Sequence, residues 1–145
     1  MEIYIEDGKL ILSKYSPLEE MDEIGFMLAG FAKTLRCPIL VCDSNKIVQL
    51  ARSPKEITKG SPVIPELATL IEQRKAMVCT NAENAIYPIV GGSLHALVIQ
   101  PIITADCDLY GAVILLATPS TQEADDNISL AATMISDAVA EYLNV

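Results

Sequence analysis

The stretch LVIQPIITADCDLYGAVILLAT, residues 97–118, decides the fold. It predicts two long strands, at residues 95–104 and 109–118, which are joined by the short link Ala-Asp-Cys-Asp. Strands joined so closely pair in antiparallel fashion. The second strand is apolar at almost every position, so both of its faces must be covered. Pro101 predicts a bulge or a sheet edge in the first strand, because proline cannot donate a ladder hydrogen bond. The stretch therefore predicts an antiparallel sheet between two covering layers.

Further elements are expected on both sides of this hairpin. Two short apolar runs surround the turn-forming letters Asp-Ser-Asn-Lys and predict a second strand pair. Prolines and Ser-x-x-Glu capping boxes mark the starts of helices. The expected strands are 39–42, 47–50, 76–80, 95–104 and 109–118, and the expected helices are about 17–36, 65–75 and 120–143.

This order predicts an α/β (α+β) domain with a mostly antiparallel sheet. The first and last helices are expected to be neighbours on one face of that sheet, and segment 54–93 to form a roof over the other face. The plan resembles that of GAF and PAS sensor domains. An N-terminal β-hairpin over residues 2–14 precedes it, because Asp7-Gly8 lies between alternating apolar residues.

Both terminal helices have more apolar surface than one packing partner requires. The first helix has a coiled-coil-like spacing of apolar residues, and the last has two apolar stripes. A helix with two apolar faces usually has two partners, so we expect a homodimer or a higher homo-oligomer. The predicted interface residues are Met21, Ile24, Leu28, Phe31, Leu35, Leu130, Met134 and Ala138.

The charge of the chain argues against nucleic-acid binding by these residues. The 145 residues have a formal net charge of −9, and the ten basic residues are scattered. Phosphate backbones are bound by clustered Lys and Arg, so no DNA-contacting residue is assigned here. No apolar run reaches the ~18 residues that a membrane span needs, and the first residues do not resemble a signal peptide. We therefore expect a cytoplasmic protein with no membrane partner.

No motif predicts catalysis or metal binding. The four cysteines match neither a zinc site nor a disulfide framework, and Cys37 and Cys42 flank an apolar strand as small core residues would. His95 is the only histidine, so a site built from several histidines is excluded. The pair Gly91-Gly92 lacks the spacing of a phosphate-binding loop. The sequence predicts a protein that is not an enzyme, with no metal and no cofactor.

A pocket for an unidentified small-molecule effector is one interpretation of the polar residues near strand ends. They could converge beneath the roof and orient a ligand, and Arg52 could anchor an anion. The alternative is that most of them are solvated strand ends. The predicted pocket residues are Asp43, Gln49, Arg52, Tyr87, His95 and Gln100.

The stretch EIYIEDGKLILSKYSP, residues 2–17, resembles the closing hairpin of the DNA-binding domain of AbrB-type transition-state regulators. Together with CPILVCDSNKIVQLA, residues 37–51, and the stretch at 97–118, it resembles the SpoVT-like family of sporulation regulators. In that family an AbrB-like domain is followed by a helix and a GAF domain. The resemblance implies a remnant AbrB-like hairpin at 1–16, a linker and dimerisation helix at 17–36, and a GAF domain at 37–145.

This resemblance implies the regulatory, sensing and dimerisation portion of a bacterial transcription factor. The arginine-bearing first half of the AbrB-like domain is not in the sequence, so DNA binding is expected only through that missing region of a longer parent protein. Residues 1–14 are expected to be disordered or paired with a second copy. The alternatives are a dimerisation module without a ligand and, less favoured, a small enzyme on a GAF scaffold.

Overall fold

The computed structural model describes residues 2–6, 9–13, 18 and 22–143. Its main feature is a five-stranded sheet with the order β4-β3-β7-β6-β5, in which every neighbouring pair is antiparallel. The predicted long hairpin forms two strands near the middle of this sheet. The strands are β3 (Ile39–Cys42), β4 (Ile47–Ala51), β5 (Met77–Val78), β6 (Ala96–Ile103) and β7 (Leu109–Leu116).

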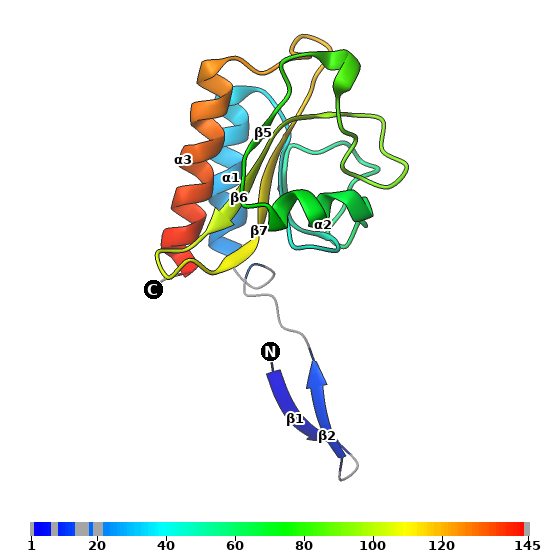
Figure 1. Ribbon diagram of the computed structural model, residues 1–145, viewed down its shortest axis with the longest axis vertical. Coiled ribbons are helices and arrows are strands. Elements are labelled where there is room, and N and C mark those ends of the chain that lie inside the picture. Colours follow the sequence, from blue (N-terminus) through cyan, green and yellow to red (C-terminus); the bar gives the residue numbers. More distant parts are fainter. Residues whose placement is uncertain (1, 7–8, 14–17, 19–21, 144–145) are drawn as a thin grey trace.

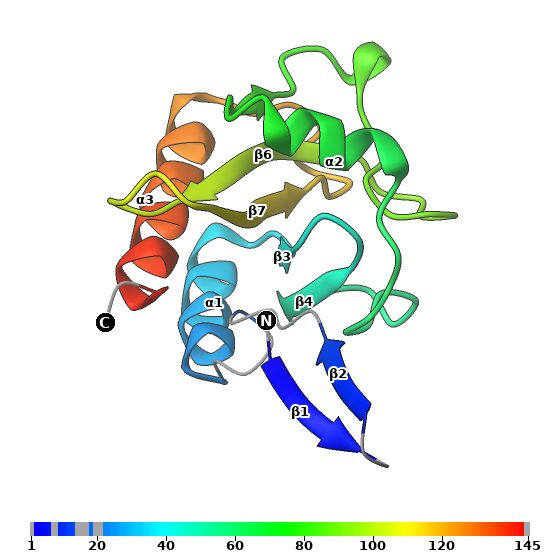
Figure 2. The same cartoon turned by 60° about the horizontal axis from the view of Figure 1, so that its bottom comes forward.

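Helices cover one face of the sheet, and a shorter helix with long loops covers the other (Figures 1 and 2). Helices α1 (Asp22–Leu35) and α3 (Asp126–Leu143) lie side by side and run in opposite directions. Helix α2 (Pro65–Glu72) and the short 3-10 helix η2 (Ala82–Asn84) belong to the opposite layer. This is the expected arrangement of two layers around one sheet.

Strand β7 shows why both faces had to be covered. Val113 and Leu115 are buried in the cluster beneath α1 and α3, whereas Ala112 and Ile114 are buried in the cluster beneath α2 and the roof. Gly111 lies at the start of this buried stretch and has φ +155°. The strand therefore has no solvated face, as its continuous apolar pattern predicted.

The end helix begins later than its capping box indicated. The letters Ser120 to Glu123 predicted a start at residue 120, but α3 begins at Asp126. The carboxylate of Asp125 accepts a hydrogen bond from the backbone N–H of Ile128 at 2.8 Å, which is an N-cap geometry. The preceding residues form a turn instead, in which Thr118 and Thr121 are bonded to each other through their backbones.

The N-terminal residues form the predicted hairpin. Strands β1 (Glu2–Glu6) and β2 (Lys9–Ser13) pair in antiparallel fashion, with Glu6 opposite Lys9. The turn letters Asp7-Gly8, the proposed first capping box at 16–19 apart from Leu18, and the interface residue Met21 lie outside the described residues. Pairing of this hairpin with a second copy stays a prediction.

The cysteines are all free thiols. Cys37 and Cys42 are buried in the two core clusters, which confirms their role as small core residues. Cys79 is also buried, and Cys107 is exposed. Among the described residues, no helix is long and apolar enough to cross a membrane.

Candidate functional site: an exposed apolar helix pair

The predicted interface residues of α1 divide into two groups. Ile24 and Leu28 are fully buried against the chain's own sheet, so they cannot also meet a second copy. Phe31 and Leu35 are half-buried and pack against the same cluster. The seam that suggested a coiled coil is thus mainly the core-facing stripe of α1, because a 3-4 spacing also describes a helix packed on a sheet.

The outward side of the helix pair also includes exposed apolar side chains. Phe26 on α1 is 80% exposed, and Leu130 and Met134 on α3 are 60% and 53% exposed. Single exposed apolar residues are ordinary, but several on two adjacent helices form a surface that needs an explanation. We call this the outer helix surface, and it comprises Phe26, Leu130, Met134, Ala138 and Tyr142.

Two residues of the outer helix surface were absent from the predicted interface. Phe26 lies outside the 3-4 seam of α1. The sequence feature that could have identified it is the additional apolar surface of that helix. Tyr142 lies eight residues after Met134, in the last turn of α3, and is 40% exposed. The two helices run in opposite directions (Figure 1). Because Phe26 is near the start of α1 and Tyr142 near the end of α3, both lie toward the same end of the pair.

Three of the six predicted pocket residues belong to the helix-covered side of the sheet. Gln49 is buried, and its Nε2 donates a hydrogen bond to the carbonyl oxygen of Leu18 at 2.9 Å. Gln100 is opposite Val113 in the register, and Val113 faces α1 and α3. The Nη1 of Arg52 lies 3.5 Å from the carbonyl oxygen of Ala32, in the last turns of α1.

These positions differ from the expected pocket beneath the roof. Arg52 is exposed, and its contact with the Ala32 carbonyl oxygen places its guanidinium beside the negative end of the α1 dipole. A cation there stabilises the helix end, which is a structural explanation for the residue that was expected to anchor an anion.

The other predicted pocket residues are elsewhere. The carboxylate of Asp43 accepts hydrogen bonds from the backbone N–H groups of Asn45 and Lys46, at 2.8 and 2.9 Å, and so holds the β3–β4 turn. Tyr87 and His95 are the one pair that the structure brings together, with ring centroids 5.9 Å apart at 69°. Apart from Tyr87 and His95, the six residues therefore do not come together in one site.

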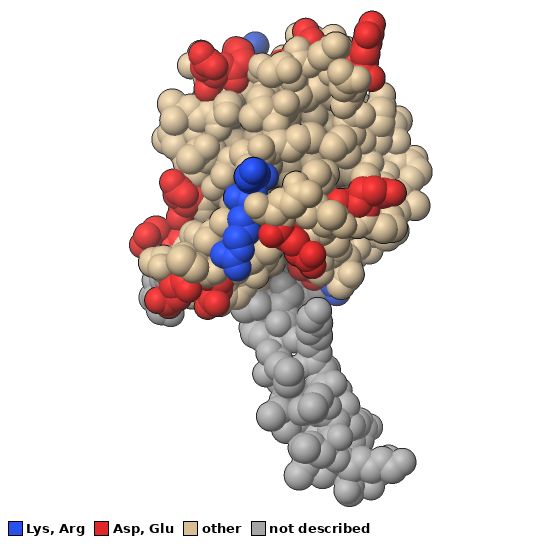
Figure 3. Space-filling model, viewed as in Figure 1, with Lys and Arg blue, Asp and Glu red and all other residues tan. Residues whose placement is uncertain are grey.

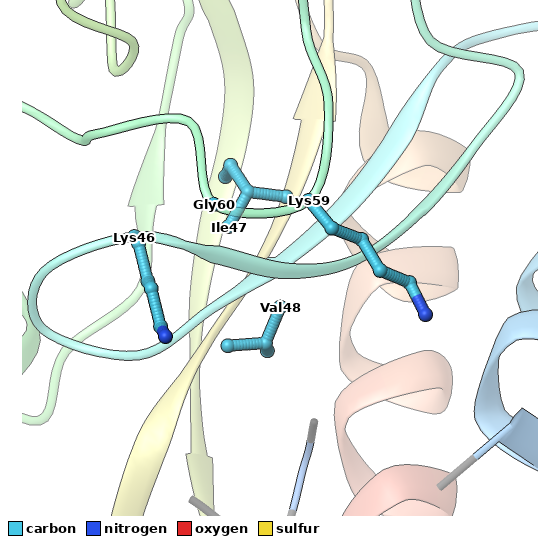
Figure 4. A pocket seen from close by; sticks show the side chains of 5 residues that line it. All are labelled: Lys46, Ile47, Val48, Lys59 and Gly60. Atoms are coloured by element: carbon cyan, nitrogen blue, oxygen red, sulfur yellow. The ribbon is translucent and has the colours of Figure 1, made fainter. Parts of the chain in front are cut away.

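A shallow hollow of about 310 Å³ lies at the outer edge of β4 (Figure 4). None of the six predicted residues is among the described residues that line it. Lys46 and Lys59 stand on either side of it in the close-up. The described lining residues are Lys46, Ile47, Val48, Lys59 and Gly60.

The described residues offer little for covalent or metal chemistry. They contain no group of three His, Cys, Asp or Glu side chains that could hold a metal ion. Burial raises the pKa of the Cys42 thiol to about 12 and that of Cys37 to about 11, although the charge of Arg52 opposes the latter. Thiols of this kind are protonated at neutral pH and are poor nucleophiles. On the face shown in Figure 3, acidic side chains are spread over several places and basic ones are few.

Comparison with known proteins identifies relatives among sporulation regulators. The family described as "Stage V sporulation protein T C-terminal, transcription factor" matches residues 27–143. Stage V sporulation protein T of Bacillus subtilis (strain 168) is 25% identical over 126 residues, which are 83% of this chain and 69% of that protein.

Solved structures with the same arrangement are GAF domains. One is the cofactor-binding GAF domain of the nutrient sensor CodY from Clostridium difficile, with a TM-score of 0.56 and 14% identity, over 82% of this chain and 83% of that one. Another is the GAF domain/HD domain protein from Geobacter sulfurreducens, with a TM-score of 0.62 and 15% identity, over 91% of this chain and 97% of that one. At such low identity these likenesses show the fold alone, and they confirm the predicted GAF-like architecture.

Proposed function

Because the chain belongs to the family of stage V sporulation protein T C-terminal, transcription factor domains, we propose that it controls a bacterial transcription factor by self-association and does not catalyse a reaction. The observation that supports this proposal is the outer helix surface. The inner stripes of α1 and α3 already pack against the sheet and fill the core, so the outer helix surface is not used in packing within the chain.

A second copy of the chain is the proposed occupant of this surface. Burying one Leu or Met side chain contributes about 1.5–3 kcal/mol, and twofold symmetry makes every such contact occur twice. Leu130 and Met134, which are four residues apart on one stripe, would thus contribute from both protomers. Acidic residues at the starts of both helices would remain at the rim.

The position of α1 suggests how such a dimer could control DNA binding. The hairpin β1–β2 precedes α1 and resembles part of an AbrB-type domain, so we propose that a domain of that type makes the DNA contacts. A dimer formed through α1 and α3 would set the separation of the two DNA-binding parts. A small-molecule effector would act by binding one dimer arrangement more tightly than another, in the cytoplasm. The GAF domain of CodY, which has a similar fold, binds a cofactor, and this supports the search for such an effector.

Native mass spectrometry and light scattering of the whole chain test the proposal. We expect a dimer for the wild type, and we expect Leu130→Glu to raise the dimer dissociation constant roughly 100-fold, because about 3 kcal/mol of paired burial is lost. Val90→Glu is the matched control, since Val90 is similarly exposed at 54% but lies in the roof. Circular dichroism shows whether each variant is folded. A monomeric wild type, or equal effects of the two substitutions, would refute self-association through this surface.

The same mass spectra address the effector. A copurified small molecule appears as a mass increase on the protomer, and its loss should change the unfolding temperature or the dimer fraction. If a panel of metabolites changes neither, the sensing part of the proposal fails and the alternative of a dimerisation module without a ligand is favoured.

A further inference from the structure

The segment between β7 and α3 is bonded to the residues that follow β5 and precede β6. We call residues 117–125 the α3 lead-in. The backbone N–H of Ala124 donates to the carbonyl oxygen of Cys79 at 2.8 Å, and the N–H of Ala117 donates to that of His95 at 2.8 Å. A third bond joins the His95 Nε2 to the carbonyl oxygen of Gln122 at 2.6 Å. These bonds hold the lead-in away from the helical path that its sequence would otherwise favour.

His95 is the only side chain with a ring in this set of bonds, and it is buried, with 5% of its surface exposed. A carbonyl oxygen can only accept, so the hydrogen of this bond is on Nε2. The Cys79 thiol approaches the same oxygen at 4.0 Å. The Gln122 carbonyl oxygen is therefore contacted by two side chains, one that follows β5 and one that precedes β6.

Tyr87 packs against the imidazole of His95. It belongs to residues 81–94, which we call the roof strap, and its ring meets the imidazole edge-on. The strap is fixed on both sides of Tyr87, because Ala96 N–H bonds to the Ile86 carbonyl and Ile64 N–H bonds to the Pro88 carbonyl, each at 2.8 Å. The Tyr87 ring is nevertheless 48% exposed. A molecule that binds at the roof can thus contact and displace this ring from the solvent side. The backbone of Tyr87 meanwhile stays attached to the sheet and to the start of α2.

We propose that His95 is a positioning residue that couples the roof strap to the start of α3. With Tyr87 packed on the imidazole, the Nε2–H bond to Gln122 keeps the lead-in docked and fixes where α3 begins. When the Tyr87 ring is displaced, the imidazole loses its support, the bond to Gln122 weakens and the lead-in opens. This coupling rests on the proposed function, because α3 contains Leu130 and Met134 of the outer helix surface.

Hydrogen exchange of the whole chain measures the coupling directly. The amides of Thr121 and Ala124 are suitable reporters, since both donate hydrogen bonds within or from the lead-in. His95→Phe keeps a ring but removes the donor, and we expect exchange at both amides to increase about five-fold, the equivalent of one ordinary hydrogen bond. His95→Gln is the matched control because its Nε2 can replace the imidazole Nε2. We expect that variant to stay within about two-fold of the wild type.

A double-mutant cycle separates coupling from a local structural effect. Tyr87→Ala should raise exchange at the two reporters in the wild-type background and add nothing in the His95→Phe background. Val90→Ala, on the same strap and with a side chain that is 54% exposed, should leave the reporters unchanged. Reporters that do not respond to Tyr87→Ala, or that respond equally in both backgrounds, overturn the coupling. If His95→Phe does not fold, His95→Leu provides the donor-free background for the same cycle.

The same samples distinguish this inference from the proposed function. Light scattering reports whether the chain dimerises, and hydrogen exchange reports whether the strap and the lead-in are coupled. A monomer with coupled reporters refutes self-association and leaves the coupling standing, whereas a dimer with independent reporters does the reverse.

Discussion

The sheet leaves no room for a side chain at Gly111. The substitution Gly111→Ala therefore tests the packing of β7 against β3. A Cβ at this position would overlap the carbonyl oxygen of Cys42. That oxygen belongs to the backbone of β3 in the middle of the sheet, so no rotamer change can relieve the overlap. The strands themselves would have to separate locally.

The expected cost has two parts. Overpacking that forces a backbone shift costs about 1–3 kcal/mol, and a non-glycine residue at positive φ adds about 1 kcal/mol or more. We therefore expect Gly111→Ala to lower the free energy of unfolding by about 3 kcal/mol, or the unfolding temperature by roughly 10 °C for a domain of this size. Urea unfolding and thermal scans at one dilute protein concentration would measure both quantities.

Two other glycines separate the two parts. Gly91 has φ +74° with nothing within 4 Å of its Cβ position, so Gly91→Ala should cost only about 1 kcal/mol. Gly30 lies in α1, also with open space, and Gly30→Ala should stabilise the chain by about 1 kcal/mol, because alanine is the better helix former. If Gly111→Ala is no more destabilising than Gly91→Ala, the inference that β7 lies too close to β3 for a side chain at residue 111 is refuted.

Two further predictions concern buried groups. Gln49→Leu keeps a similar volume but leaves the Leu18 carbonyl without its side-chain donor. It should lower the free energy of unfolding, measured in urea, by about 1–3 kcal/mol. Gln100→Leu on the same face is the control and should stay within about 0.5 kcal/mol of the wild type. The pKa of the Cys42 thiol is raised from 9.0 to about 12 by burial, so the unfolded chain loses this proton first, and the free energy of unfolding should fall as the pH rises from 9 toward 12. Urea midpoints at pH 8 and pH 10.5 should show the fall, with a smaller slope in Cys42→Ala, and an equal slope in both proteins would contradict it.

Local patterns were sufficient to predict the centre of the sheet. The β6–β7 hairpin is formed by residues close in sequence, and the apolar letters of β7 required cover on both faces, as observed. The elements that differ from expectation depend on distant partners. Strand β5 has two residues instead of five, and after it Cys79 donates one backbone hydrogen bond to Leu97 of β6 and accepts one from Ala124 of the lead-in. The start of α3 is displaced from Ser120 to Asp126 by bonds from Cys79 and His95, which no local rule contains.

The candidate surface was predictable only in part, for a related reason. An apolar stripe on a helix reports that the stripe is covered, but not by what. Leu130 and Met134 could be assigned to an outer surface because α3 has a second stripe that fills the core. On α1 the regular seam through Ile24 and Leu28 proved to be the core stripe, and the exposed residue is Phe26. Residues expected to form a pocket, such as Gln49 and Arg52, instead bond to backbone groups near the two ends of α1, and those partners are set by tertiary structure.

The packing of α3 limits how any signal can act on the outer helix surface. Its inner residues Ala132, Ile135 and Val139 are fully buried against the sheet, and close-packed interiors do not deform continuously. Rolling the helix to move Leu130 and Met134 would expose those residues, so the middle of α3 is fixed. The end that precedes Leu130 is different, because residues 118–125 of the lead-in include no fully buried side chain and are held mainly by hydrogen bonds. A change in association that originates in the roof is therefore expected to act by lengthening or fraying the start of α3, which follows the lead-in residue Gln122 to which His95 is bonded.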